Sequence, residues 1–493
     1  MKELARLVVP ALRWDAAHGF GYLDGLIEDA LELGVGGFVL DGAPPRDEAA
    51  RLAARLHAES VHPILVAAKA ERGAGETIEG LTQLPPLGAV SAAALVHGEA
   101  GTLPSLEMGA IRRAARITAR ELRSVGVNWA LAPACDLDVP HGFERVGVRG
   151  ASDDPAVAAA VVSEWVDACH AESTVACAMH FPGIGNARIE GGVPVVARSE
   201  FDLRHADIVP FAAAVDAGVA SVMIAAAIVP ALGARDGVTR SADAISRLLR
   251  AELGFDGIAA TAPLDDEPGI APTQEAAHAV GAVAAGCDVV LAPGDLDGTV
   301  LALERAALDG VVAPGRARKA LDRVARWAGW ARPADGAGGT QGSAGAAVSL
   351  DDMMWSRQIA DRACQWLSGG RPRIGAAVEV LTLGAPMPHV TQTLRALHVE
   401  LTESNAVMAG MRAPLVVCFA PPAGPGDDVA RGALDETRSA ARVAIAAGRD
   451  VAVIAACHPR AAGGVGSDVP VVCIWEPTRA MQEAGARALF TQR

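Results

Sequence analysis

The chain is 493 residues long and 51 % hydrophobic, enough to bury the cores of roughly two or three domains. Its formal charge of −15, with no Lys/Arg stripe along any expected helix or strand, argues against a nucleic-acid partner. The apolar runs are too short to span a membrane, and the first 15 residues lack a signal-type apolar core, so we expect a cytoplasmic protein without a membrane partner. The eight cysteines are scattered without C-x-x-C spacing, which predicts reduced core residues and no metal site.

Short apolar runs alternate with longer stretches of helical period through the first two thirds of the chain. Helices are expected at 107–125 and 153–171, the second opened by acidic residues and Pro155. Eight strand-plus-helix repeats of this length favour a closed (β/α)8 barrel, similar to a TIM barrel, over 1–332. The expected strands lie in the runs at 5–12, 36–40, 63–68, 127–133, 175–181, 221–227, 257–262 and 288–293.

The segment that follows the barrel is rich in Gly, Ala and Ser. We expect a flexible linker at 333–350 and a second, smaller domain at 351–493. A helix at 351–368 and strands near 376–384, 397–403, 414–420, 450–457 and 469–475 predict an α/β sandwich. No G-x-G-x-x-G follows a strand, so we expect no dinucleotide and no other cofactor.

A loop at 178–194, AMHFPGIGNARIEGGVP, directly follows the fifth expected strand. Its Pro and Gly residues are typical of a backbone that presents a side chain at a strand end, here His180. A structural turn around a buried histidine is the alternative.

Four blocks resemble one enzyme family in order and spacing: GVNWALAPACDLD, RGASDDP, HFPGIG and AELGFDGIAATAPL. They are similar to the N-terminal barrel of family 3 glycoside hydrolases, in particular the bacterial β-N-acetylglucosaminidase (β-hexosaminidase) branch, from about residue 5 to 330. The resemblance implies a retaining glycosidase, which requires a nucleophilic carboxylate close to an acid/base group. The smaller domain resembles the C-terminal domain of two-domain members.

Most positions that carry the family's chemistry hold other residues here. The resemblance implies an Asp nucleophile where the chain has Ala262, and an acid/base His in an Asp-Ser-His loop that is absent after Gly185. Two positions match the family and are the expected substrate contacts, Arg149 and His180. The resemblance implies replacements at five further positions: Lys69 stands in place of an Asp, Thr77 of an Arg, Met179 of a Lys, and Ile184 and Ala226 each of a His.

Three interpretations remain open. The first is a protein that has lost hydrolysis and binds an amino sugar or glycan fragment through Arg149 and His180. In the second, catalytic carboxylates have moved to Asp265 or Glu190, although Pro263 restricts the backbone beside Ala262. In the third, the protein is a structural partner of a paralogous protein, its pocket filled by side chains such as Met179 and Ile184. Lys69 is either a solvated surface lysine or points into the barrel mouth, where Asp136 and Glu190 are its candidate partners.

Overall fold

The computed structural model describes residues 3–96, 105–139, 146–266, 270–332, 348–368, 372, 374–408, 410–421 and 427–490. The chain forms two compact units. The first comprises Met1–Gln83 and Val96–Ser349, and the second comprises Leu84–Leu95 and Leu350–Arg493. Residues 333–347 of the predicted linker lie outside the described residues.

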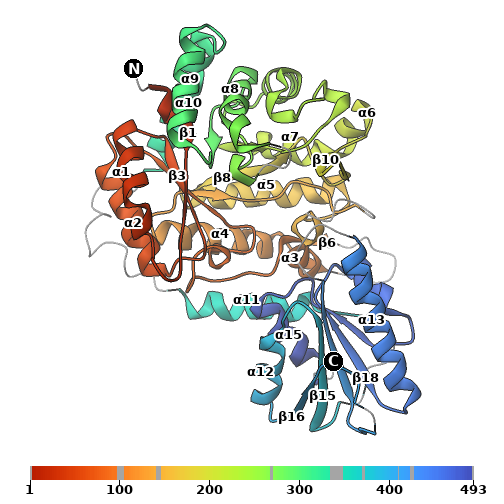
Figure 1. Ribbon diagram of the computed structural model, residues 1–493. Coiled ribbons are helices and arrows are strands. Elements are labelled where there is room, and N and C mark those ends of the chain that lie inside the picture. Colours follow the sequence, from red (N-terminus) through yellow and green to blue (C-terminus); the bar gives the residue numbers. More distant parts are fainter. Residues whose placement is uncertain are drawn as a thin grey trace. The chain divides into compact units, whose positions relative to one another are not determined.

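The first unit is a barrel of parallel strands with helices on its outside (Figure 1). Seven strands follow one another around the sheet, and β13 closes it by pairing with β1 and by a bridge between Val289 and Ala260. Pro10 divides the first strand into β1 and β2 because it has no N–H to donate. The predicted barrel is confirmed. Its strands are β1 (Val8–Val9), β2 (Ala11–Arg13), β3 (Gly37–Asp41), β4 (Leu65–Lys69), β7 (Trp129–Leu131), β8 (Val175–Phe181), β11 (Ser221–Ile224), β12 (Ile258–Ala260) and β13 (Val290–Leu291).

The helices of the first unit alternate with these strands. The two helices expected from the sequence are α4 and α5, and the Asp154 carboxylate caps α5 by accepting from the N–H of Ala156 at 2.8 Å. A π-helix at Asp243–Glu252 takes the helical position between β11 and β12. The α-helices are α1 (Asp24–Leu33), α2 (Arg46–Glu59), α4 (Met108–Ser124), α5 (Pro155–Ala171), α6 (Glu200–Asp202), α7 (Val209–Asp216), α8 (Glu275–Ala285), α9 (Leu296–Leu308) and α10 (Pro314–Trp330).

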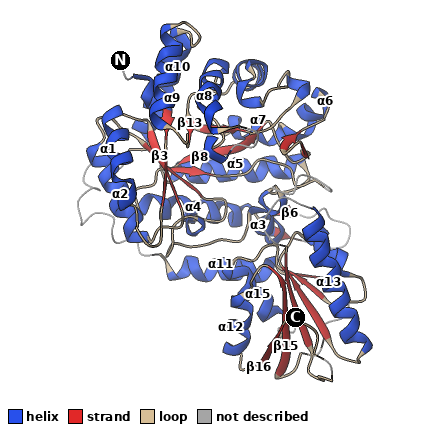
Figure 2. Cartoon of the chain, in the orientation of Figure 1, coloured by secondary structure: helices blue, strands red, loops and turns tan. Residues whose placement is uncertain are grey.

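The second unit is an α/β sandwich around a six-stranded sheet, in the order β14-β19-β18-β17-β15-β16. Helix α13 covers one face, and α12 and α15 cover the other (Figure 2). The unit also includes α3 (Leu87–Ala94), which contacts α11. The elements are α11 (Leu350–Ala363), β14 (Gln365–Ser368), β15 (Ala377–Gly384), α12 (Pro388–Ala396), β16 (Glu400–Ser404), β17 (Leu415–Ala420), α13 (Asp427–Ala446), β18 (Val451–Ala455), α14 (Pro459–Ala462), β19 (Val471–Cys473) and α15 (Arg479–Ala488).

The expected helix at 351–368 is wrong in its last part. Helix α11 ends at Ala363, and the next residues form β14, which pairs antiparallel with β19. The partner strand lies about a hundred residues further along the chain, so the local pattern alone carried no signal for this pairing. No helix among the described residues combines the length and apolar character needed to cross a bilayer.

Candidate functional site

Four polar side chains form a continuous chain of contacts at the carboxyl ends of the barrel strands. The His180 ring, at the end of β8, contacts Asp136 through Nδ1 at 2.7 Å and Arg149 through Nε2 at 3.2 Å. The Arg149 Nε–H donates to both carboxylate oxygens of Glu71 at 3.0 Å. The loops after β4, β7 and β8 therefore meet at one place, and both residues expected to contact substrate, Arg149 and His180, are in direct contact with each other.

Hydrogen-bond roles follow from the chemistry of the partners. A guanidinium has no acceptor, so Nε2 of His180 accepts from Arg149 and the ring proton lies on Nδ1, which donates to Asp136. Asp136 is 1 % exposed, and its second oxygen accepts from the N–H of Ile184 at 2.8 Å. Burial by itself raises the pKa of the Asp136 carboxyl, but the interactions with His180, with the Ile184 N–H and with Arg149 together lower it.

Arg149 is held in its charged form. Burial lowers the pKa of its guanidinium, whereas the charge and hydrogen bond of Glu71, with Asp136 and Glu76 beyond, outweigh burial and raise it. The network thus has one guanidinium between two carboxylates, with the imidazole of His180 joining it to Asp136.

The HFPGIG loop is shaped by two glycines at positions where a side chain would collide with a neighbouring segment of the chain. Gly183 has φ +109°, and a Cβ there would lie 2.9 Å from the Cβ of Asp207. A Cβ on Gly185 would lie 2.2 Å from the carbonyl oxygen of Leu137, in the loop after β7. This close approach brings the Ile184 N–H onto Asp136, and so the glycines position the histidine network.

Apolar side chains occupy other positions around the same face. Ala262, the second residue after β12, is 8 % exposed, and beside it the Thr261 hydroxyl accepts from the N–H of Leu291 at 3.0 Å. Met179 is 3 % exposed and Ile184 is 8 % exposed. Ala226 is half-buried in the bend after β11. None of these four side chains carries a group that can donate or accept a proton.

Lys69 ends β4 and points toward the barrel axis. The Trp129 indole N–H, on β7, donates to the Ser221 hydroxyl on β11 at 2.8 Å, and side chains of alternate strands meet inside a barrel. Ala67 pairs in register with Trp129, and side chains alternate along a strand, so Lys69 also faces inward. Lys69 is exposed, and its carbonyl accepts from the hydroxyl of Thr77 at 2.8 Å, so Thr77 fixes the backbone of this loop.

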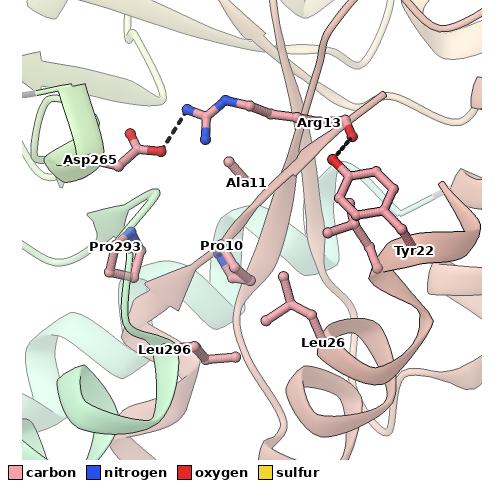
Figure 3. Close-up of a pocket in the computed structure, with 10 residues that line it drawn as sticks. Pro10, Ala11, Arg13, Tyr22, Leu26, Asp265, Pro293 and Leu296 are labelled. Atoms are coloured by element: carbon pink, nitrogen blue, oxygen red, sulfur yellow. Dashed lines mark hydrogen bonds and ion pairs between the residues drawn. The ribbon is translucent and has the colours of Figure 1, made fainter. Parts of the chain in front are cut away.

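The two carboxylates considered as relocated catalytic groups lie in different surroundings. Asp265 has a side chain only 16 % exposed, and it forms an ion pair with Arg13 at 2.5 Å (Figure 3). Glu190 lies on β9 (Arg188–Glu190), whose residues are all exposed and which pairs with β10 (Val193–Val195) in a hairpin. Glu267, two residues beyond Asp265 along the chain, lies outside the described residues.

Asp265 lines a pocket of about 220 Å³ between the first and last strands of the barrel. Prolines and leucines make up half of its lining residues, and Tyr22 donates its hydroxyl to the carbonyl of Arg13 at 2.6 Å at the rim (Figure 3). The pocket shares no lining residue with the network around His180. Among the described residues, no group of three His, Cys, Asp or Glu side chains is arranged to hold a metal ion.

Comparison with known sequences decides the family. The sequence pattern of the glycosyl hydrolase family 3 N-terminal domain matches residues 28–327, more than half of the chain. The chain belongs to glycosyl hydrolase family 3. Within this family it is 29 % identical over 308 residues to a β-N-acetylglucosaminidase/β-glucosidase of Cellulomonas fimi, covering 59 % of this chain and 52 % of that protein. It is 32 % identical over 253 residues to a β-hexosaminidase of Xanthomonas oryzae pv. oryzae, covering 50 % of this chain and 72 % of the relative.

Solved family 3 structures share the fold. A β-N-acetylglucosaminidase from Paenibacillus sp. str. FPU-7 superposes with a TM-score of 0.82 at 21 % identity, over 99 % of this chain and 96 % of that one. An exo-1,3/1,4-β-glucanase from a Pseudoalteromonas species superposes with a TM-score of 0.75 at 16 % identity, over 98 % of this chain and 66 % of that one. These similarities extend across both units of the family 3 chain.

The network around His180 includes two residues that the sequence did not assign to a site. Asp136 was expected only as a partner of Lys69, and instead it contacts His180. Glu71, two residues beyond the end of β4, was not considered at all. Its place at the carboxyl end of a barrel strand was the available signal.

Proposed function

We propose that this family 3 protein binds an amino sugar or glycan fragment at the mouth of its barrel and does not hydrolyse it. The observation that carries the proposal is the contrast between two parts of the same face. The polar network of Glu71, Arg149, His180 and Asp136 is complete, whereas Ala262 presents a buried methyl group after β12.

Loss of hydrolysis follows from the requirements of the reaction. A retaining glycosidase needs a nucleophilic carboxylate and an acid/base group about 5–5.5 Å apart. The methyl group of Ala262 cannot attack an anomeric carbon, and the hairpin of β9 and β10 offers only Glu190 on its exposed strand. In this proposal the protein therefore lacks both the nucleophile and the acid/base group at the family's positions.

Binding is supported by the arrangement of the remaining polar groups. Arg149 is half-buried and held in place by Glu71, so its guanidinium is already ordered before a ligand arrives. Ordered donors lose less conformational freedom on binding, which favours recognition of sugar hydroxyl or amide oxygens.

Two measurements test the proposal. We expect no hydrolysis of a chromogenic N-acetylglucosaminide above background between about pH 5 and 8, a range in which such an acid/base pair operates. We expect N-acetylglucosamine or a muropeptide-like fragment at ten times its Kd to stabilise the protein by about 1.4 kcal/mol in thermal unfolding and to give heat in calorimetry. The variant Arg149→Met should lose this stabilisation, and Arg318→Met, on the exposed surface of α10, serves as the matched control.

Two outcomes would replace the proposal. Turnover that disappears in Asp265→Ala or Glu190→Gln would favour an active β-N-acetylhexosaminidase-type enzyme with relocated carboxylates, for which the partly buried Asp265 is the better candidate. No turnover, no heat and no thermal shift at millimolar ligand would favour a structural partner of a paralogous protein. The buried side chains of Met179 and Ile184 are consistent with that interpretation.

A further inference from the structure

The outer face of α9 exposes large apolar side chains. Leu301 is 72 % exposed and Leu308, two helical turns further on, is 71 % exposed. Val311, just beyond the helix, is 59 % exposed. Residues seven apart lie on the same side of a helix, so the two leucines form one stripe that faces away from the barrel.

The sequence of this stripe is self-complementary. Residues 301–308 read LALERAAL, with a leucine at each end and Glu304 next to Arg305 at the centre. If a second copy of the helix packs antiparallel about the midpoint, Leu301 meets Leu308 of the other copy and Glu304 meets Arg305 of the other copy. The leucines of the two copies then bury each other's apolar surface, and an ion pair between Glu304 and Arg305 forms twice.

We propose that α9 is a homodimer interface, in which two copies of this chain pack their α9 helices antiparallel about a two-fold axis between Glu304 and Arg305. A two-fold interface requires one self-complementary patch, and this stripe is such a patch. In a parallel arrangement Glu304 would face Glu304 of the other copy and Arg305 would face Arg305, so like charges would repel each other.

The central charges are already restrained within each chain. The Nε–H of Arg305 donates to Asp309 at 2.9 Å, and Glu304 accepts from the N–H of Leu4 at 3.1 Å. Restrained side chains lose less freedom on association. A single pair of helices covers less than a standard interface, so we expect a weak dimer with a Kd on the order of tens of micromolar.

Sedimentation velocity over a concentration series of the full chain tests the proposal. The protein should shift from monomer to dimer, and Leu308→Glu should weaken the dimer at least about a hundredfold because each dimer then buries two unpaired carboxylates. Val61→Glu is the matched control, since Val61 is a single exposed apolar residue, 84 % exposed, after α2. A chain that stays monomeric, or a dimer that Leu308→Glu leaves intact, overturns the proposal.

Charge exchange tests the antiparallel register. Arg305→Glu alone places carboxylates opposite each other and should weaken the dimer about tenfold, whereas Glu304→Arg combined with Arg305→Glu should restore it. Thermal unfolding of each variant monitors the loss of the Leu4 contact. In a Cys364→Ser background, a mixture of Leu301→Cys and Leu308→Cys proteins should form disulfide-linked dimers on mild oxidation, and either variant alone should not. Cross-linking of Leu301→Cys alone would show either a parallel pairing or an antiparallel pairing in another register, and both would overturn the proposed geometry.

Discussion

Placing a carboxylate at position 262 is the sharpest test of the proposed loss of hydrolysis. Ala262 directly follows Thr261 at the end of β12, so Ala262→Asp places a carboxylate at the family's nucleophile position. We expect this variant not to hydrolyse glycosides. The family resemblance implies that the acid/base residue is absent, that Met179 replaces a Lys and that Lys69 replaces an Asp.

The size of the deficit follows from these three absent groups. A general acid, or an electrostatic or positioning group, is typically worth about a hundredfold or more in rate. Three such groups correspond to about a millionfold, or about 8 kcal/mol of transition-state stabilisation. Apolar Met179 and inward-facing, exposed Lys69 supply none of it at these positions. A single carboxylate therefore leaves the reaction below detection.

The assay uses an activated aryl N-acetylglucosaminide, because a good leaving group relaxes the need for an acid. Released phenol is followed in the first seconds, and intact-protein mass spectrometry looks for an added sugar. Ala262→Asn is the control, because the Asn side chain has the shape of Asp but its amide oxygen is a much weaker nucleophile than a carboxylate oxygen. A burst with added mass, or sustained turnover, seen with Asp and not with Asn, would refute the proposal that several catalytic groups have been lost together.

Two further predictions concern stability and pH. Asp136→Asn should lower the free energy of unfolding by about 2 kcal/mol at pH 7, and the loss should shrink in acid. Because the pKa of Asp136 is lowered in the folded protein, its ionised carboxylate stabilises the fold above the unfolded pKa of 3.8, and this contribution disappears as pH falls through the folded pKa. Urea unfolding at pH 7 and in acid checks this, and an equal loss at both would contradict it. Burial, with Arg240 adding to it, lowers the pKa of the His278 imidazole from 6.5 to about 4, so the unfolded chain binds a proton that the folded protein does not and stability falls on acidification across that window. His278→Gln should remove up to about 3 kcal/mol of this pH dependence in the same urea series, and an unchanged slope would show that other groups cause it.

The barrel was predictable because its signal is local. Most of the strands are short apolar runs buried on both sides, and the helices between them carry their own start signals, such as Asp154 and Pro155 at α5. The end of α11 was not predictable in this way. Gln365–Ser368 becomes a strand only because β19 offers an edge, and that edge is assembled from residues remote in sequence.

The candidate site was predictable only as a set of single residues. Arg149 and His180 stand in recognisable blocks, so each was found by itself. Their contact with each other, and with Asp136 and Glu71, depends on how three loops dock, and that docking rests on close approaches such as the one at Gly185. A sequence states that glycine is there but not which carbonyl lies against it.

The short helix α3 has a consequence for how this chain can be divided. Leu84–Leu95 belongs to the compact unit formed mainly by the C-terminal third, although it is encoded within the barrel. Seven of the eight residues of α3 are buried. A gene fragment cut at the Gly/Ala/Ser-rich segment therefore gives one product that carries an orphaned helix and another that lacks part of its core. Recombination at that point therefore exchanges an incomplete module.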